Sequence, residues 1–270
     1  MGASFSVLNN LAAINGINKL NANNVHLYNT LNRLASGKRI NTGADDAAGL
    51  QIADGLRGHI MALNQSSRNA ADGIAYLQIA DGALDQVISM LQRMVTLAAQ
   101  AANGTLTNSN RSALQKEFEA LNEEIGRIAD DTNFNGKAIF GGDGSIKVFI
   151  GDISRNHSTL EVKIASAEKV NGNLNSSTAA QNALSSLKVA LNSVATARGD
   201  IGAGMNRLQA AINVISAQSQ NTLSAESTIR DANMADEITA MIKYQIMAQA
   251  GIAALAQANA NAQNILSLLR

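Results

Sequence analysis

The chain has 270 residues, of which 46% are hydrophobic but only 3% aromatic; its 21 basic and 21 acidic residues cancel, and it has no Cys and no Pro. A net charge of zero argues against nucleic-acid or anionic-membrane binding, because those partners require a basic surface. The lack of Cys excludes disulfides and thiol chemistry. The most apolar stretch, 246–256, is too short to span a bilayer. The N-terminus has no basic segment followed by an unbroken apolar run, so we expect no cleaved secretory signal.

From residue 56 to residue 98 the apolar residues recur in steps of four and three, which is typical of one long coiled-coil helix. Without Pro, nothing forces this helix to kink. Asn103-Gly104 is a typical helix stop. The predicted core positions are Leu56, Ile60, Leu63, Ser67, Ala70, Ile74, Leu77, Asp81, Leu84, Ile88, Leu91, Val95 and Ala98.

A second helix is predicted over Ser109 to Asp130, with Ser109 or Asn110 as its N-cap. The Asn- and Gly-rich residues 132–144 predict repeated turns. Beyond them, apolar residues alternate in two short runs, which predicts a β-hairpin within about 138–166. Its inward positions are Ile146, Val148, Ile150, Leu160, Val162 and Ile164. The polar residues 166–178 are read as a connector.

The heptad repeat returns after the connector and decays into polar residues past Ile215. The predicted core positions are Leu184, Leu187, Leu191, Val194, Arg198, Ile201, Met205, Leu208, Ile212, Ile215, Ser219, Thr222, Glu226 and Ile229. This predicts a second long helix beside the first.

Each end of the chain carries one further heptad stripe, rich in Ala and Asn, that cannot bury itself alone. The two predicted helices should pair, parallel or antiparallel, and their sparse packing predicts that they are disordered in the monomer and become ordered on assembly. We name the two stripes together the terminal seam. Its N-terminal members are Ala13, Ile17, Leu20, Asn24, Leu27, Leu31 and Leu34, and its C-terminal members are Ile238, Met241, Gln245, Ala248, Ile252, Leu255, Asn259, Ala262, Leu266 and Leu269.

No catalytic, cofactor-binding or metal-ligating set emerges from the sequence. His26, His59 and His157 lack the spacing of metal ligands. The adjacent acids Asp45-Asp46 and Glu123-Glu124 are interpreted as capping or solvated residues, because Asp and Glu favour helix N-termini and exposed faces. We therefore expect a protein that is not an enzyme and holds no cofactor.

Several segments resemble bacterial flagellin, and they occur in that family's order. The segments are LNRLASGKRINTGADDAAGLQIADGLR (31–57), RNAADGIAYLQIADGALDQVISMLQRMVTLAAQAANG (68–104), TNFNGKAIF (132–140), ARGDIGAGMNRLQAAI (197–212) and AQANANAQNILSLLR (256–270). The middle of the chain departs from the family pattern, since flagellins often carry large outer domains there. The first twenty residues match only loosely. The resemblance implies a short-form flagellin.

The resemblance implies a mainly α fold: a coiled-coil rod or bundle of long helices formed by both chain ends, with a small β-hairpin region. The inner domain would comprise the helices of residues 1–44 and 231–270, and a rod domain would span 45–230. The implied function is a structural subunit that polymerises through its terminal helices into the flagellar filament. Alternatives are a hook–filament junction protein of the same superfamily or a secreted helical adhesin or effector.

Other copies of the chain are the main implied partner, followed by a flagellar export chaperone and by cap and hook-junction proteins. The implied location is extracellular, after export without a cleaved signal peptide. A host partner, the Toll-like flagellin receptor, is implied by the match at Arg93, Leu97 and Gln100, which share one helix face, with Glu117 on the next helix. In related flagellins this face also contacts the neighbouring subunit, and we expect it to be exposed in the monomer.

Overall fold

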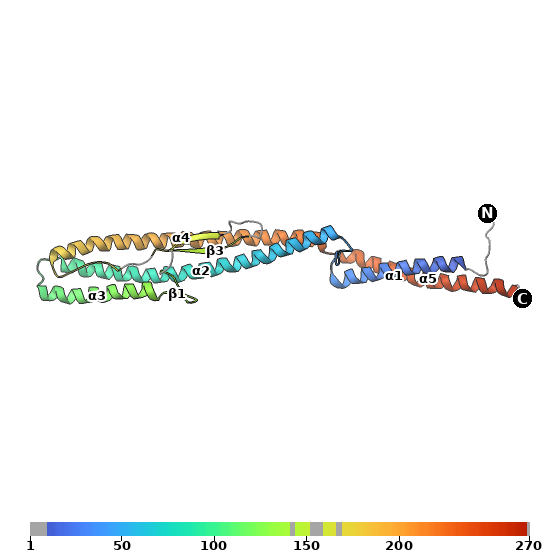
Figure 1. Cartoon of the computed structure of the whole chain (residues 1–270), viewed down its shortest axis with the longest axis horizontal. Helices are drawn as coiled ribbons and strands as arrows, with labels where there is room; N and C mark the ends of the chain where they lie inside the picture. Colours follow the sequence, from blue (N-terminus) through green and yellow to red (C-terminus); the bar gives the residue numbers. More distant parts are fainter. Residues whose placement is uncertain (1–9, 141–143, 152–158, 166–168, 269–270) are drawn as a thin grey trace. The chain divides into compact units, whose positions relative to one another are not determined.

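The structure is a computed structural model that describes residues 10–140, 144–151, 159–165 and 169–268 (Figure 1). Its elements are α1 (Leu11–Ser36), α2 (Ala47–Ala101), α3 (Asn108–Asp131), β1 (Asn133–Phe134), β2 (Lys137–Ala138), β3 (Ser145–Phe149), β4 (Thr159–Lys163), α4 (Ser177–Arg230) and α5 (Met234–Leu268). The predicted mainly α fold with a small hairpin region is confirmed. The chain forms two compact units, residues 1–58 with 222–270 and residues 59–221, and α2 and α4 contribute to both.

Local hydrogen bonds determine where the shorter helices begin and end. Asn10 Oδ1 accepts a backbone N–H of the first turn of α1 at 3.0 Å. Gly37 ends α1 at a φ of 69°, a left-handed conformation that glycine adopts without strain. The N-cap of α3 is Thr107, whose Oγ1 accepts the Asn110 N–H at 3.3 Å. The predicted cap at Ser109 or Asn110 was therefore wrong, because the helix begins slightly earlier.

In the unit of residues 59–221, α2 and α4 carry most of the core, and the predicted heptads are half correct. One predicted position per heptad is buried: Leu63, Ala70, Leu77, Leu84, Leu91 and Ala98 on α2, and Leu187, Val194, Ile201, Leu208 and Ile215 on α4. At most of the other positions the buried residue lies one before the predicted one: Ser66, Gly73, Ala80, Val87 and Met94 on α2, and Ala183, Ala197 and Gly204 on α4. At 190–191 and at 211–212, both neighbours are half-buried. The residues predicted for these positions only flank the core: Ser67, Ile74, Asp81, Ile88 and Val95, and Leu184, Leu191, Arg198, Met205 and Ile212.

Glycines at two of these core positions allow the hairpin to lie against the helices. β3 and β4 pair antiparallel, with Ile146 opposite Val162 in the register, which confirms the predicted hairpin. A Cβ on Gly73 would lie 2.8 Å from Val148 Cγ2, and a Cβ on Gly204 would lie 2.6 Å from Val162 Cγ1. Because real Cβ contacts are not that short, only glycine leaves room for the two valines. The predicted loop residues 152–158 lie outside the described residues.

The Asn- and Gly-rich segment after α3 forms a second, minimal hairpin, in which β1 pairs antiparallel with β2. Asn135 and Gly136 connect them at φ values of 51° and 77°. Both residue types tolerate this left-handed conformation, which two-residue hairpin turns require. The sequence predicted turns here but not this pairing.

The connector before α4 packs into the core, although its polar composition predicted only a link. Val170 is 5% exposed and Leu174 is fully buried. Two side chains of α3 accept their backbone N–H groups: Asn122 Oδ1 from Val170 at 2.8 Å, and Gln115 Oε1 from Leu174 at 2.6 Å. The buried backbone of a segment without secondary structure is thereby satisfied.

A charged cluster links α2 to α4 beside their core. Arg198 donates from Nε and Nη2 to the two carboxylate oxygens of Asp81, at 2.7 and 3.1 Å, and from Nη1 to Asp85 at 2.7 Å. The hydrogen bond to Asp81, more than any other effect, raises the pKa of the Arg198 guanidinium. Both Asp81 and Arg198 were predicted as core positions. They instead form a bidentate pair at its edge, where charged groups keep contact with water.

Candidate functional site

The terminal helices α1 and α5 pair antiparallel within the unit of residues 1–58 and 222–270 (Figure 1). Their buried and half-buried positions again follow a 3-4 spacing, and every second one lies one residue before the predicted position. These positions are Ala13, Gly16, Leu20, Asn23, Leu27, Thr30 and Leu34 on α1, and Glu237, Met241, Tyr244, Ala248, Gly251, Leu255 and Ala258 on α5. Small and polar residues therefore occupy half of the contact between the two helices.

The predicted terminal seam is divided between two faces. Leu20, Leu27, Leu34, Met241 and Leu255 are half-buried. Leu31, Ile238 and Ile252 are 41%, 43% and 59% exposed. Their predicted place between α1 and α5 was wrong, since they lie one residue beyond the contact positions. Leu269 and the side chain of Leu266 lie outside the described part of the chain.

Two leucines fit opposite two glycines and bring the helices close together. A Cβ on Gly16 would lie 2.7 Å from Leu255 Cδ2, and a Cβ on Gly251 would lie 3.3 Å from Leu20 Cδ1. The arrangement is reciprocal, because each helix supplies one leucine and one glycine. Small residues permit such close packing of helix backbones, so Gly16 and Gly251, which look like helix breakers in sequence, are packing residues here.

Polar side chains add bonds across the same pair. Asn23 is 5% exposed and donates from Nδ2 to the Tyr244 carbonyl at 2.8 Å. One helical turn away, the His26 ring stacks on the Tyr244 ring with 5.5 Å between centroids. Asn10 Nδ2 donates to the Ala258 carbonyl at 3.1 Å. Asn23 and Tyr244 were not among the predicted contact residues, although polar residues recurring at heptad spacing could have identified Asn23.

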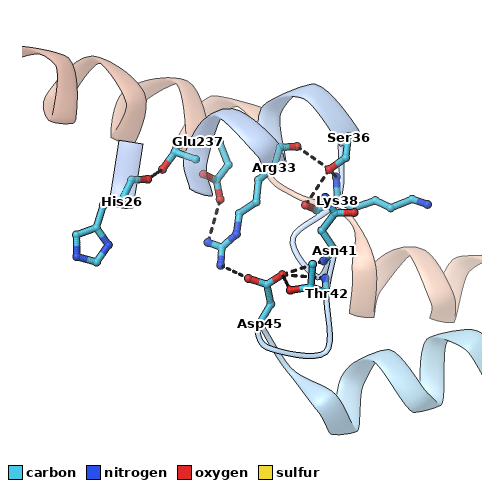
Figure 2. A network of polar contacts seen from close by, with 9 residues as sticks. His26, Arg33, Ser36, Lys38, Asn41, Thr42, Asp45 and Glu237 are labelled. Atoms are coloured by element: carbon cyan, nitrogen blue, oxygen red, sulfur yellow. Dashed lines mark hydrogen bonds and ion pairs between the residues drawn. The ribbon is translucent and has the colours of Figure 1, made fainter. Parts of the chain in front are cut away.

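Arg33 stands at the centre of the polar network that joins α1 to the following loop and to α5 (Figure 2). Its two Nη atoms lie 3.7 Å from Asp45 and 3.6 Å from Glu237. Asp45 also accepts the backbone N–H groups of Thr42 and Asn41, at 2.9 and 3.2 Å, and the Thr42 hydroxyl. These bonds, led by the Thr42 N–H, hold the pKa of the Asp45 carboxyl below its usual value.

The loop after α1 also pairs with the short link between α4 and α5. The Arg39 N–H donates to the Arg230 carbonyl at 2.7 Å, and the Ala232 N–H donates to the Gly37 carbonyl at 3.0 Å. Between them, Lys38 and Asp231 form an isolated antiparallel bridge. The two chain segments that lead into the terminal helices are thus held together by backbone hydrogen bonds.

The second set of candidate residues lies on α2 and α3. Arg93 and Glu117 form an ion pair, with 2.7 Å between Nη2 and Oε1, so Glu117 does lie beside Arg93 as expected. Gln100 is exposed, but Leu97 is only 2% exposed. The expectation that Leu97 belongs to an exposed face was wrong, because its side chain packs into the core of this unit.

In the described ranges, no group of three or more His, Asp or Glu residues is arranged to hold a metal ion. No helix in that part of the chain is long and apolar enough to cross a membrane. His157 lies outside the described residues. Asp46 caps α2 through a 2.9 Å bond from the Gly49 N–H, as the capping interpretation of the Asp45-Asp46 pair predicts.

Comparison with known proteins identifies the family. Residues 7–145 match the bacterial flagellin N-terminal helical region, and residues 184–269 match the bacterial flagellin C-terminal helical region. The chain is 37% identical over 276 residues to a flagellin of Halalkalibacterium halodurans and 38% identical over 302 residues to a flagellin of Bacillus subtilis. Both alignments cover 97% of this chain and 98% of the relative.

A solved structure supports the same conclusion. The crystal structure of Bacillus cereus flagellin is 30% identical, with a TM-score of 0.51, over 59% of this chain and 94% of that one. Both flagellins are matched over nearly their whole length and are of similar length to this chain, so the chain has the family's short form without large outer domains. The chain belongs to the bacterial flagellins and is a structural subunit of the extracellular flagellar filament.

Proposed function

We propose that the chain polymerises through α1 and α5, whose outward apolar faces pack against the same helices of neighbouring copies. The observation that carries this proposal is the distribution of exposed large apolar side chains. Of nineteen such residues in the described part of the chain, fourteen belong to the unit of residues 1–58 and 222–270, the smaller of the two. Monomeric proteins rarely expose large contiguous apolar patches, so this concentration favours an interface.

The exposed residues of α1 form a second stripe on the helix. Leu11, Ile14, Val25 and Tyr28 are 69%, 48%, 59% and 65% exposed. Each precedes a contact position such as Ala13 by two residues, which at about 100° per residue places it roughly on the far side of the helix from α5. A helix that is apolar on two sides is stable only when both sides are covered. Its partner in the chain covers one side, and other copies would cover the second.

Helix α5 contributes the other half of this surface. Ile238, Ile242, Ile246 and Ile252 are between 43% and 59% exposed. Under this proposal, Leu20, Leu27, Leu34, Met241 and Leu255 hold the terminal helices together, whereas Leu31, Ile238 and Ile252 contact neighbouring copies. By their spacing in the sequence, Leu266 and Leu269 continue the predicted terminal seam. Residues 1–44 and 231–270 then act as the assembly domain, and residues 45–230 as the supporting domain.

The same exposed surface accounts for the other partners that we propose. An export chaperone would cover the apolar α5 before assembly, since an uncovered surface of this kind promotes aggregation. Cap and hook-junction proteins would meet α1 and α5 at the two ends of the polymer. Export would proceed without cleavage of a signal peptide.

We also propose the Arg93 face as a contact for the host Toll-like flagellin receptor and for the neighbouring subunit. Arg93, Gln100 and Glu117 are the exposed members of this surface. Leu97 supports it from beneath as a buried residue. Exposed Arg residues that become buried in an interface are frequent binding hot spots, which favours Arg93 as the central contact.

Deletion of residues 231–270 tests the assembly proposal. The truncated chain should stay soluble and largely helical but form no filaments, because α1 then lacks its partner and its neighbours. A finer variant replaces Ile242 and Ile246 with Gln. Its matched control replaces Val189 and Val214, exposed valines of the other unit, with Gln. Sedimentation and electron microscopy should show filaments for the control alone, and filaments of normal length from the truncation would refute the proposal.

A further inference from the structure

The contact between α1 and α5 contains few large side chains, so apolar packing alone does not explain a unique alignment of the two helices. Ala, Gly, Asn and Thr occupy many of the contact positions. Sliding an antiparallel partner by one heptad moves each contact residue to the next equivalent position. An alignment therefore needs specific features that are lost when one helix slides.

The two reciprocal leucine–glycine pairs together are such a feature, because no one-heptad slide keeps a leucine opposite both glycines. Leu255 packs into the space at Gly16, and Leu20 packs into the space at Gly251. If α5 slid by one heptad so that Leu20 faced Ala258, Leu255 would move from Gly16 to Asn23. Leu20 would then meet a residue with a Cβ, and an apolar side chain would press on a buried amide.

Asn23 adds a polar requirement at the same place. Its Nδ2 bonds to the Tyr244 carbonyl, and its Oδ1 has no hydrogen-bond partner in the described ranges. A buried amide with one unsatisfied atom does not contribute to stability as an apolar residue would. A single polar residue at a core position of a coiled coil instead specifies register, at a cost in stability.

Two further contacts agree with the same alignment. His26 stacks on Tyr244, and Arg33 lies 3.6 Å from Glu237. After a one-heptad slide in that direction, Gly251 would take the place of Tyr244, and the Arg33 side chain would face Tyr244 in place of a carboxylate. Three kinds of contact, steric, aromatic and ionic, therefore coincide in one register.

We infer that Gly16, Gly251 and Asn23 are the residues that determine the register of α1 against α5, and that filament assembly depends on this register. The second clause rests on the proposed assembly function. The register determines which outward residues of α1 and α5 lie side by side. Since a neighbouring copy must fit both helices at once, a slid pair presents a mismatched surface.

Because the chain has no Cys, engineered cysteine pairs can report the register without background. Ala13 and Ala258 lie three residues beyond the Gly16–Leu255 contact on either helix, so A13C with A258C reports the observed register. In that register Thr30 faces Met241, and a slide by one heptad would bring Ala248 opposite Thr30 instead. The pair T30C with A248C therefore reports the slid register. Mild oxidation, in dilute solution and under polymerising conditions, is followed by denaturing gels that separate intramolecular from intermolecular products.

Gly16→Leu, Gly251→Leu and Asn23→Leu are each combined with both reporters. Gly55→Leu is the matched control, since Gly55 is a helical glycine of the same unit with nothing within 4 Å of an added Cβ. In the parent and the control, only the 13–258 pair should crosslink. In Gly16→Leu and Gly251→Leu, that product should fall by about fivefold or more, because the added side chain fills the space of a leucine. In Asn23→Leu, the 30–248 product should appear while helix content is kept or rises, an outcome that a merely structural role of Asn23 does not produce.

Unchanged 13–258 crosslinking in all three variants would overturn the register assignment. Crosslinking that changes as expected while the variants still form normal filaments would overturn the link from register to assembly. Both outcomes differ from failure of the assembly proposal itself, which is tested separately by the 231–270 truncation. We expect the parent chain to polymerise only when residues 231–270 are present. We expect the register variants to lose both the observed register and the ability to form filaments.

Discussion

Val162 of β4 lies so close to Gly204 of α4 that a Cβ on residue 204 would be 2.6 Å from Val162 Cγ1. The other strand repeats this relationship, with Val148 against Gly73 of α2. The two glycines, one on each long helix, therefore let the hairpin pack closely against α2 and α4. Neither is conspicuous in the sequence, because the large residues beside them carry the apparent heptad pattern.

Gly204→Ala tests whether the contact between Gly204 and Val162 requires glycine. The new methyl group would overpack the contact with Val162, costing about 1–3 kcal/mol, and better helix propensity would offset roughly 1 kcal/mol of that. Gly199→Ala on the same helix has nothing within 4 Å of the new Cβ and should stabilise the chain. Urea unfolding followed by circular dichroism compares the two, and equal midpoints would show that the hairpin adapts without cost.

Arg111→Lys should destabilise the turn between α2 and α3. Arg111 is 7% exposed and donates from Nε to the Ala101 carbonyl at 2.9 Å and from Nη2 to the Asn103 carbonyl at 2.8 Å. A Lys ammonium cannot serve both carbonyls with the geometry of a planar guanidinium, so we expect a loss of about 1–3 kcal/mol. Arg127→Lys, on the exposed face of α3, is the control and should shift the unfolding midpoint little. Similar small shifts for both would contradict the view that the Arg111 guanidinium stabilises this turn through the two carbonyls.

The loop of Asp45 should loosen in acid. The pKa of this carboxyl is lowered in the folded chain, chiefly by the Thr42 and Asn41 N–H groups. The charged Asp45 carboxylate thus stabilises the fold fully at pH values above its usual pKa of 3.8. This stabilisation is lost as the pH falls from that value through the lowered pKa of the folded state. Over this window in the parent chain, the amides of residues 41 and 42 should lose protection against hydrogen exchange, measured relative to an unprotected amide at the same pH. In Asp45→Asn their protection should be low throughout, and a parent-like pH profile of protection in that variant would refute the assignment.

Arg93→Ala should weaken receptor binding by about tenfold or more and also reduce filament stability, because one exposed surface serves both contacts. Arg68→Ala, an exposed arginine on the same helix, is the control. Binding to the purified receptor ectodomain and thermal dissociation of filaments are the two readouts. No change in either would show that Arg93 is only solvated, and loss of one alone would show that the two surfaces differ.

Leu97→Ala provides an independent check on that surface. Leu97 is 2% exposed, so its truncation should lower the free energy of unfolding by about 2–5 kcal/mol. Its effect on receptor binding should disappear when binding is measured per folded molecule. A direct loss of affinity in fully folded Leu97→Ala would place this side chain in the contact after all.

The sequence alone determined the number and kind of the long helices, the position of the β3–β4 hairpin and the family. These properties depend on local patterns: heptad spacing, the absence of Pro, alternating apolar residues and ordered motifs over most of the chain. The predicted helix ends lay close to the observed ones for the same reason. The N-cap of α3 was misplaced because Thr, Ser and Asn can all cap a helix.

Only the tertiary structure decided which side of each helix is inside. A heptad stripe of large residues, such as Ile17, Leu31 and Ile252, predicted the contact face, but packing placed Gly16, Thr30 and Gly251 there. Two backbones that approach closely need small residues between them, and large residues then flank the contact or point outward. The sequence contains both stripes, and the choice between them depends on partners that lie more than two hundred residues away along the chain, such as Tyr244 for Asn23.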